Sequence, residues 1–298
     1  MATKQVTNHK ENNQTSSIWS WRVFVPVIVA GFFFLLANSA LWVNNVLFNN
    51  EQFTQTASSA LLSESSRMSI AEGVVDQALA DRPVAQRLVS QPATKFVAGL
   101  LDSSLAQKAT KKVVSRLQTA VTTANPQNIE LDLTGIKNIA SKLVALADAA
   151  DVEVQKPQKE LPDTIVLFDA SKVPNLYSYG QFFLWLAPLA GLLAVGLFAY
   201  PHIREKRLVK RIMALEGAVL VGFGLLALSL GPLFRPQVLG GVESSNARVV
   251  VENIYNAFVA TFNAQTQWLF LLGTLFILIP TSVWLYEKQI KPLLKKRN

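Results

Sequence analysis

Four stretches of the chain hold no charged residue, and their lengths constrain the fold more than any other feature of the sequence. They contain 28, 31, 18 and 34 residues, and they lie between Arg22 and Glu51, Lys172 and Arg204, Glu216 and Arg235, and Glu252 and Glu287. A helix needs about 20 apolar residues to cross the hydrocarbon core of a bilayer. Each stretch contains such a run, so we expect four transmembrane helices.

The predicted spans are residues 21–43, 182–200, 212–230 and 268–286. Tryptophan favours the headgroup level of a bilayer. Trp21 stands at the start of the first apolar run and Trp42 near its end, so these side chains mark two interfaces. A cleaved signal peptide is the alternative for this first span, because small residues at 37–40 follow the apolar run. The run resumes at 41–43 and favours an uncleaved anchor.

Lysine and arginine near the span ends predict the orientation of the chain. The hairpin 201–211 and the tail 287–298 each carry a net charge of +4, and residues 1–22 carry +2. Residues 44–181 hold 13 basic and 14 acidic side chains, and residues 231–267 hold two of each. We therefore expect both termini and the hairpin in the cytoplasm, and the segments 44–181 and 231–267 outside.

The net charge of +8 thus lies mainly at membrane borders. Insertion and anionic lipid explain such charges, so the sequence predicts the bilayer as a partner and no nucleic acid. The chain has no cysteine, and its sequon Asn13-Gln14-Thr15 lies in the polar leader 1–20, which we expect to be disordered and cytoplasmic. These features favour a multi-pass protein of a prokaryotic cell (inner) membrane.

Residues 44–181 are numerous enough to form an independent extracytoplasmic domain with its own core. Its apolar periodicity is mostly helical. Ser69 and Glu72 form a capping box that predicts a helix start, and Pro83 and Pro92 each fit the first turn of a further helix.

The end of this domain changes period. Residues 129–133 alternate apolar and acidic side chains, and residues 165–168 are apolar. Both patterns predict short strands that could pair with each other. For runs this short, a helix or a loop is the alternative. A helical pattern covers 136–146 between them. The loop 231–267 has helical spacing and is expected to pack against this domain; a partner-binding helix is the alternative. The expected class is a mainly α membrane protein with four transmembrane helices, a mostly helical outer domain and a small two-stranded β element.

Three motifs follow the anchor in order: VLFNNEQF at 46–53, IELDL at 129–133 and TIVLFDASKV at 164–173. With three further spans behind them, they resemble a group of uncharacterised bacterial integral membrane proteins frequent in actinobacteria. Those proteins often have an acidic residue before the phenylalanine of the first motif, where this chain has Asn49 and Asn50 nearby. The resemblance implies the architecture and no catalytic residue.

Catalytic and cofactor-binding patterns are missing from the sequence. Without cysteine there is no thiolate metal site, and the two histidines, His9 and His202, form no His-Glu-x-x-His helix. The predicted spans contain neither histidine nor aspartate, and the chain has no Walker-type phosphate loop. We therefore expect no enzyme, no cofactor, no metal and no catalytic residue.

Two polar residues near the spans are candidates for function. An ionisable group in a bilayer is functional by default, which draws attention to Glu216. The structural interpretation, which we favour, is that it reaches the cytoplasmic interface or pairs with Arg211 or Lys210. Asn38 is expected to make an interhelical hydrogen bond rather than to bind a ligand.

Two further patterns have structural interpretations. Small residues at 190, 194, 218 and 222 predict tight packing between the second and third spans, with a substrate path as the alternative. Three acids at 148–153 suggest a calcium site but lack the glycine turn of a calcium loop, so a solvated linker is preferred. These acids are Asp148, Asp151 and Glu153.

The leading hypothesis is a membrane protein that displays residues 44–181 for binding protein or other partners, or for envelope organisation. The alternative is a transport subunit with the topology of macrolide-exporter-type ABC permeases. In that case the hairpin would act as a coupling helix on an ATPase subunit, through its apolar residues Ile203, Leu208, Val209 and Ile212.

Overall fold

The computed structural model describes residues 21–78, 83–124, 129–132, 164–168 and 176–290. The chain forms two compact units. The first contains Met1–Ala37, Leu189–Ala227 and Thr266–Asn298, and the second contains Asn38–Pro188 and Leu228–Gln265. The boundary between the two units falls within long helices.

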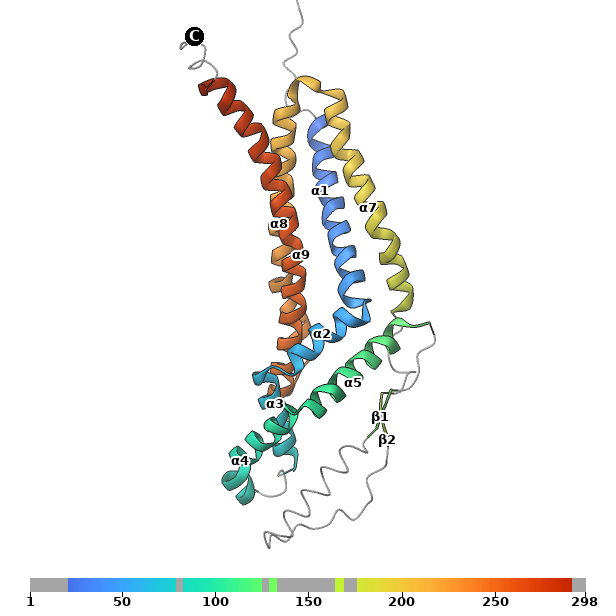
Figure 1. The fold of residues 1–298 in the computed structure, drawn as a ribbon, viewed down its shortest axis with the longest axis vertical. Coiled ribbons are helices and arrows are strands. Elements are labelled where there is room, and N and C mark those ends of the chain that lie inside the picture. Colours follow the sequence, from blue (N-terminus) through green and yellow to red (C-terminus); the bar gives the residue numbers. More distant parts are fainter. Residues whose placement is uncertain (1–20, 79–82, 125–128, 133–163, 169–175, 291–298) are drawn as a thin grey trace, which may run out of the picture. The chain divides into compact units, whose positions relative to one another are not determined.

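Four long helices dominate the described part of the chain (Figure 1). They are α1 (Trp21–Trp42), which a π-helical segment (Val43–Leu47) continues, α7 (Tyr177–Arg204), α8 (Val209–Leu239) and α9 (Ser245–Leu285), which ends in a second π-helical segment (Tyr286–Ile290). All four are long and apolar enough to cross a membrane, as the charge-free stretches predicted. The chain is therefore a mainly α membrane protein.

The helices run well past the predicted spans. Residues 231–267, expected as a loop, are the end of α8 and the first half of α9, joined by a short turn. The bilayer sets a minimum length for a spanning helix and no maximum, so the helical pattern of 249–262 continues into the span. α8 ends where Gly240 donates its N–H to the carbonyl of Pro236 at 2.8 Å.

The core of the first unit comes from parts of all four long helices. Its largest cluster is Val27, Ala30, Phe198, Val219, Leu220 and Leu269. The Phe198 ring from α7 lies 5.2 Å from the ring of Phe34 on α1. Because lipid is as apolar as these side chains, close packing rather than burial from water stabilises such a contact.

Small residues pack closely in this unit. The predicted ones on α7, Ala190 and Ala194, are buried, whereas those predicted on α8 are not the residues that pack. A Cβ on Gly217 of α8 would lie 2.5 Å from the carbonyl oxygen of Gly273 on α9. Gly222 has no atom within 4 Å of its Cβ position, and Ala218 is exposed. The expected small-residue face of α8 is therefore wrong, because the helix turns the Gly217 side, one residue away, toward α9.

The second unit contains four shorter helices, drawn blue to green in Figure 1. They are α2 (Asn50–Leu61), α3 (Glu64–Ala78), α4 (Pro83–Leu101) and α5 (Ser104–Thr122). The side chain of Asn49 accepts a hydrogen bond from Gln52 N and begins α2, and Ser103 does the same for Ala106 N in α5. Pro83 opens α4 as predicted.

Two predicted helix starts are wrong. Ser69 lies inside α3 and is buried, so it is not an N-cap; the helix begins five residues earlier at Glu64. Pro92 lies inside α4 rather than at the first turn of a new helix. Both patterns are local, whereas the helices continue because their apolar residues pack against neighbours.

Strands β1 (Ile129–Asp132) and β2 (Thr164–Phe168) pair antiparallel. Asp132 faces Thr164 and Ile129 faces Phe168, with a register irregularity after Ile129. The helix expected at 136–146 and the three acids at 148–153 lie outside the described residues.

The first half of α9 packs against α1 and the shorter helices, as expected for 231–267. Phe258 lies 5.2 Å from Phe53 on α2, between ring centroids. Asn253 donates hydrogen bonds to the hydroxyls of Ser65 and Ser66 on α3 at 2.8 and 2.9 Å. These contacts tie the sequence-distant parts of the second unit together.

Candidate functional site

The second unit contains an apolar pocket formed by α3, α4 and α5 with the end of α2. Its volume is about 530 Å³, which lies within the usual range of about 300–1,000 Å³ for small-molecule sites. Eleven of its fourteen lining residues are apolar, among them Leu62, Ile70, Leu100, Leu105 and Val113. We call this the outer pocket, after the segment 44–181 that the sequence predicts to lie outside the membrane.

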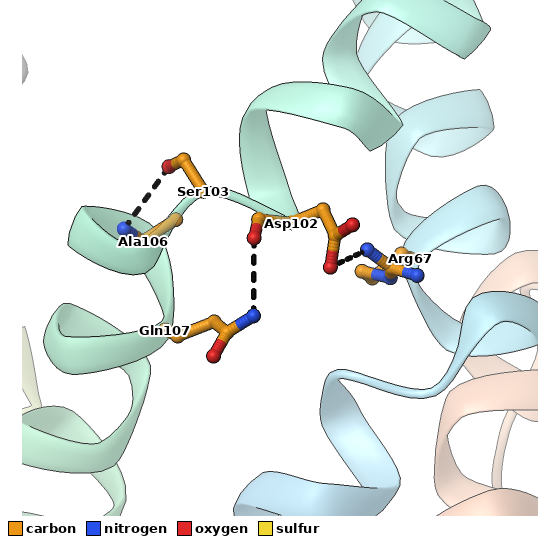
Figure 2. Close-up of polar contacts among 5 residues, drawn as sticks. All are labelled: Arg67, Asp102, Ser103, Ala106 and Gln107. Atoms are coloured by element: carbon orange, nitrogen blue, oxygen red, sulfur yellow. Dashed lines mark hydrogen bonds and ion pairs between the residues drawn. The ribbon is translucent and has the colours of Figure 1, made fainter.

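The polar residues that line the outer pocket are Arg67, Ser103 and Thr110. The guanidinium of Arg67 forms an ion pair with the Asp102 carboxylate at the corner between α4 and α5 (Figure 2). The Arg67 side chain is 19% exposed and that of Asp102 is 59% exposed. The ion pair therefore connects a largely buried residue of the pocket lining with an exposed residue at the protein surface.

Other contacts hold the corner in place. Gln107 donates its amide N–H to the main-chain carbonyl of Asp102 at 3.0 Å, and the Ser103 hydroxyl accepts from Ala106 N at 3.3 Å (Figure 2). The Asp102 backbone is thereby fixed while its carboxylate stays accessible. Arg67 Nε is buried and makes no hydrogen bond within the described residues.

The chemistry of the outer pocket suits an amphiphile. Its apolar walls can bury a hydrocarbon chain, and the Arg67 guanidinium can donate to an oxygen-bearing head. A second apolar cavity of about 470 Å³ lies between α1, α8 and α9 in the same unit, but no charged residue lines it. Of these two apolar cavities, the outer pocket is the one with a charged group that could orient a polar head.

A polar contact between α2 and α5 supports the walls of the outer pocket. The side-chain amide of Asn50 donates to Gln118 Oε1 at 2.8 Å and to the Ser115 carbonyl at 3.0 Å, and it accepts from the Ser115 hydroxyl at 2.7 Å. Gln118, which is buried, donates in turn to the Leu47 carbonyl at 3.1 Å. The NN pair of the first motif thus caps α2 and fixes α5 against it.

In the first unit, Glu216 pairs with a residue that the sequence did not suggest. Its carboxylate oxygen Oε2 lies 3.0 Å from His202 Nε2, and its side chain is 1% exposed. It reaches neither Arg211 nor Lys210; Lys210 pairs instead with Glu287 at 2.6 Å. The expectation of an arginine or lysine partner is wrong because both cations are exposed while the Glu216 carboxylate points inward.

The remaining candidates are structural or lie outside the described residues. The predicted interhelical hydrogen bond of Asn38 is confirmed: Gln265 on α9 donates to its side-chain oxygen at 3.2 Å and to its carbonyl at 2.7 Å. Within the described ranges, histidines and acids form no group that could hold a metal ion. The three acids at 148–153 lie outside these ranges.

Sequence reasoning missed the outer pocket as a site. The apolar stripes of α4 and α5 are visible in the sequence, but their spacing predicts buried faces, not a cavity between them. Comparison with known protein families, with curated proteins and with solved structures yields no match for this chain. The function is therefore inferred from the sites themselves.

Proposed function

We propose that the protein is a non-enzymatic binding protein of a bacterial cell membrane, whose outer pocket accepts the hydrocarbon chain of a membrane-derived amphiphile. Both termini would lie in the cytoplasm and the helical domain outside. The observation that carries the proposal is an apolar pocket of about 530 Å³ with one guanidinium in its lining. Arg67 would contact the head of the ligand.

Connectivity supports a lipid-derived ligand. α2 begins at Asn50, three residues after the candidate span Trp21–Leu47 ends. The domain that forms the pocket is therefore tethered directly to a membrane helix. Amphiphiles are concentrated in the bilayer, so a pocket on so short a tether meets them at high effective concentration.

The transport alternative has less support. Two of the four apolar residues that would form a coupling surface, Leu208 and Ile212, are buried against Val23 in a small core. Ile203 is exposed, but residues 206–208 form only a single 3₁₀ turn. A partner ATPase would therefore find one exposed apolar side chain and the half-buried Val209 rather than a continuous apolar surface.

The test is photocrosslinking in nanodiscs with a fatty acid that carries a diazirine near the end of its chain. Crosslinked peptides of the full-length protein are identified by mass spectrometry. We expect adducts on the α4 and α5 segments that line the outer pocket. Adducts on the long helices measure contact with bulk lipid and serve as the internal standard.

A matched pair of variants makes the test specific. Ala106→Phe places a ring in the outer pocket and should reduce the α4 and α5 adducts severalfold relative to the standard. Lys108→Phe puts the same ring on an exposed position of α5 that does not line the pocket, and should leave the ratio unchanged. Adducts confined to the long helices, or equal yields in both variants, would overturn the proposal.

A further inference from the structure

The first unit contains a second pocket, and its lining is strongly basic. It has a volume of about 560 Å³ and lies between the turn that joins α7 to α8 and the end of α9. Four cations line it: Lys206, Arg207, Lys210 and Arg211. We call it the basic pocket. No acid is among its lining residues.

Three of these cations are available to a ligand. Lys210 is held by Glu287, with Nζ and Oε2 2.6 Å apart. Lys206, Arg207 and Arg211 are exposed and form no ion pair with any residue that the structure describes. Because like charges so close together repel one another, an anion that binds among them relieves that repulsion.

The opposite side of the basic pocket comes from α9 and is apolar apart from one hydroxyl. Pro280 and Thr281 form part of it, and Trp284 is 51% exposed with the Lys288 ammonium 4.8 Å from its ring centroid. An indole with its ring against lipid and a cation nearby is typical of a bilayer interface. The pocket therefore combines a cationic side with an apolar side at the end of candidate spans.

We propose that the basic pocket binds the headgroup of an anionic phospholipid. The phosphate diester contacts the guanidinium groups of Arg207 and Arg211, whose planar donors match phosphate oxygens, and Lys206 adds a further charge. The acyl chains leave along Trp284 and α9. Basic pockets between transmembrane helices are a recurrent form of anionic-lipid site, and scattered border charges without a cavity are not.

Inorganic phosphate presents the same oxygen atoms as a lipid headgroup but has no acyl chains. Only a lipid also contacts the apolar side of the pocket, so binding of the two ligands responds differently to a change at Trp284. Substitution of Trp284 by Ala removes apolar contact and leaves every cation in place. It weakens binding of a lipid and leaves binding of free phosphate unchanged.

The experiment is native mass spectrometry of the full chain released from mild detergent with phosphatidylglycerol or phosphatidylcholine added. Wild type should retain one phosphatidylglycerol in preference to phosphatidylcholine. The double variant Arg207→Gln/Arg211→Gln should lose that preference by roughly tenfold or more, because each basic residue near the headgroup adds to the attraction. Lys111→Gln/Lys112→Gln removes the same charge from exposed positions of α5 and should keep it.

Three outcomes of this experiment have different meanings. Loss of the preference in the arginine variant, with a second loss in Trp284→Ala, supports the lipid site. Competition by millimolar inorganic phosphate that is unaffected by Trp284→Ala assigns the pocket to a soluble phosphate and overturns the lipid. Equal retention in the arginine and lysine double variants overturns the site itself. All substituted side chains are exposed, and thermal unfolding in detergent verifies that each variant is folded.

Discussion

His202 and Glu216 join two membrane helices through a contact of 3.0 Å between Nε2 and Oε2, although fourteen residues separate them in sequence. The Glu216 side chain is almost fully buried, and its other oxygen, Oε1, makes no hydrogen bond within the described residues. His202 is thus the polar group that compensates the burial of this carboxyl. Removing one partner is therefore expected to lower the stability of the protein more than removing both.

The substitution His202→Ala should lower the thermal stability of the detergent-solubilised protein. It leaves the Glu216 carboxyl buried with no partner, which costs about 1–3 kcal/mol. The double variant His202→Ala/Glu216→Leu should regain most of the loss, because a buried polar pair can be replaced by apolar side chains at little cost. Arg204→Ala, an exposed neighbour on α7, is the control. Equal stability of the single and double variants would show that the unpaired Glu216 carboxyl costs nothing and would contradict this account.

The approach of α8 to α9 predicts a difference between two glycines on one helix. Gly217→Ala places a Cβ 2.5 Å from the Gly273 carbonyl oxygen, a backbone atom that moves only if the helices separate. We expect a loss of about 1–3 kcal/mol, as for other overpacked sites. Gly222→Ala meets no atom within 4 Å and should be neutral or slightly stabilising, since alanine favours helix. Chemical unfolding of both variants in the same micelle measures the difference.

The long helices could be predicted from the sequence and the contacts between them could not. A charge-free run of sufficient length has few alternatives in a bilayer, so all four helices were identified. Their ends were placed too early. The predicted second span stops at residue 200, but α7 continues through Pro201 to Arg204 and so places His202 beside α8. A membrane helix tolerates proline when neighbouring groups satisfy the freed carbonyl.

The outer pocket likewise could not be predicted from the sequence. The apolar residues of α4 and α5 were recognised from their spacing, but the spacing does not show that α3, α4 and α5 leave part of their apolar surface uncovered around a pocket. The position of α5 is fixed in part by contacts with distant residues, such as Asn50 on α2, which is sixty-five residues from Ser115. Local patterns carry no information about pairs so distant. Arg67 likewise looks like an ordinary exposed cation until Asp102 is found beside it.

The absence of cysteine makes the proposed orientation directly testable. Single cysteines at Lys111→Cys on α5 and Arg207→Cys between α7 and α8 both replace exposed side chains. In spheroplasts treated with a membrane-impermeant maleimide, the first should react at once and the second only after lysis, because basic segments stay in the cytoplasm. The reverse pattern would invert the topology and place the basic pocket outside.

The ion pair in the outer pocket predicts a gain of binding on removal of a charge. Asp102 is exposed and competes with an acidic ligand head for the Arg67 guanidinium. Asp102→Asn frees that guanidinium and should raise crosslinking of a diazirine fatty acid a fewfold, since a partly exposed pair is worth about 0–1 kcal/mol. A diazirine fatty alcohol of equal length should not respond. If both probes rise equally, Asp102 acts through the shape of the pocket rather than through charge.

The adjacent residues Asn49 and Asn50 should respond oppositely to the same substitution. Asn49→Asp keeps the oxygen that caps α2 at Gln52 N, and it adds a negative charge where the helix dipole favours one. It should be neutral or stabilising. Asn50→Asp replaces the amide that donates to Gln118 Oε1 and the Ser115 carbonyl with an oxygen that faces both.

We expect Asn50→Asp to cost about 1–3 kcal/mol through unpaired acceptors, with early loss of the α2 to α5 contact. Hydrogen exchange of the full-length protein in nanodiscs measures this locally: α5 amides should exchange faster in Asn50→Asp and unchanged in Asn49→Asp. Because α5 forms a wall of the outer pocket, Asn50→Asp should also reduce the fatty-acid adducts on α5. Protection of α5 that is identical in both variants would show that another contact holds the helix, and would remove Asn50 from the account of the pocket.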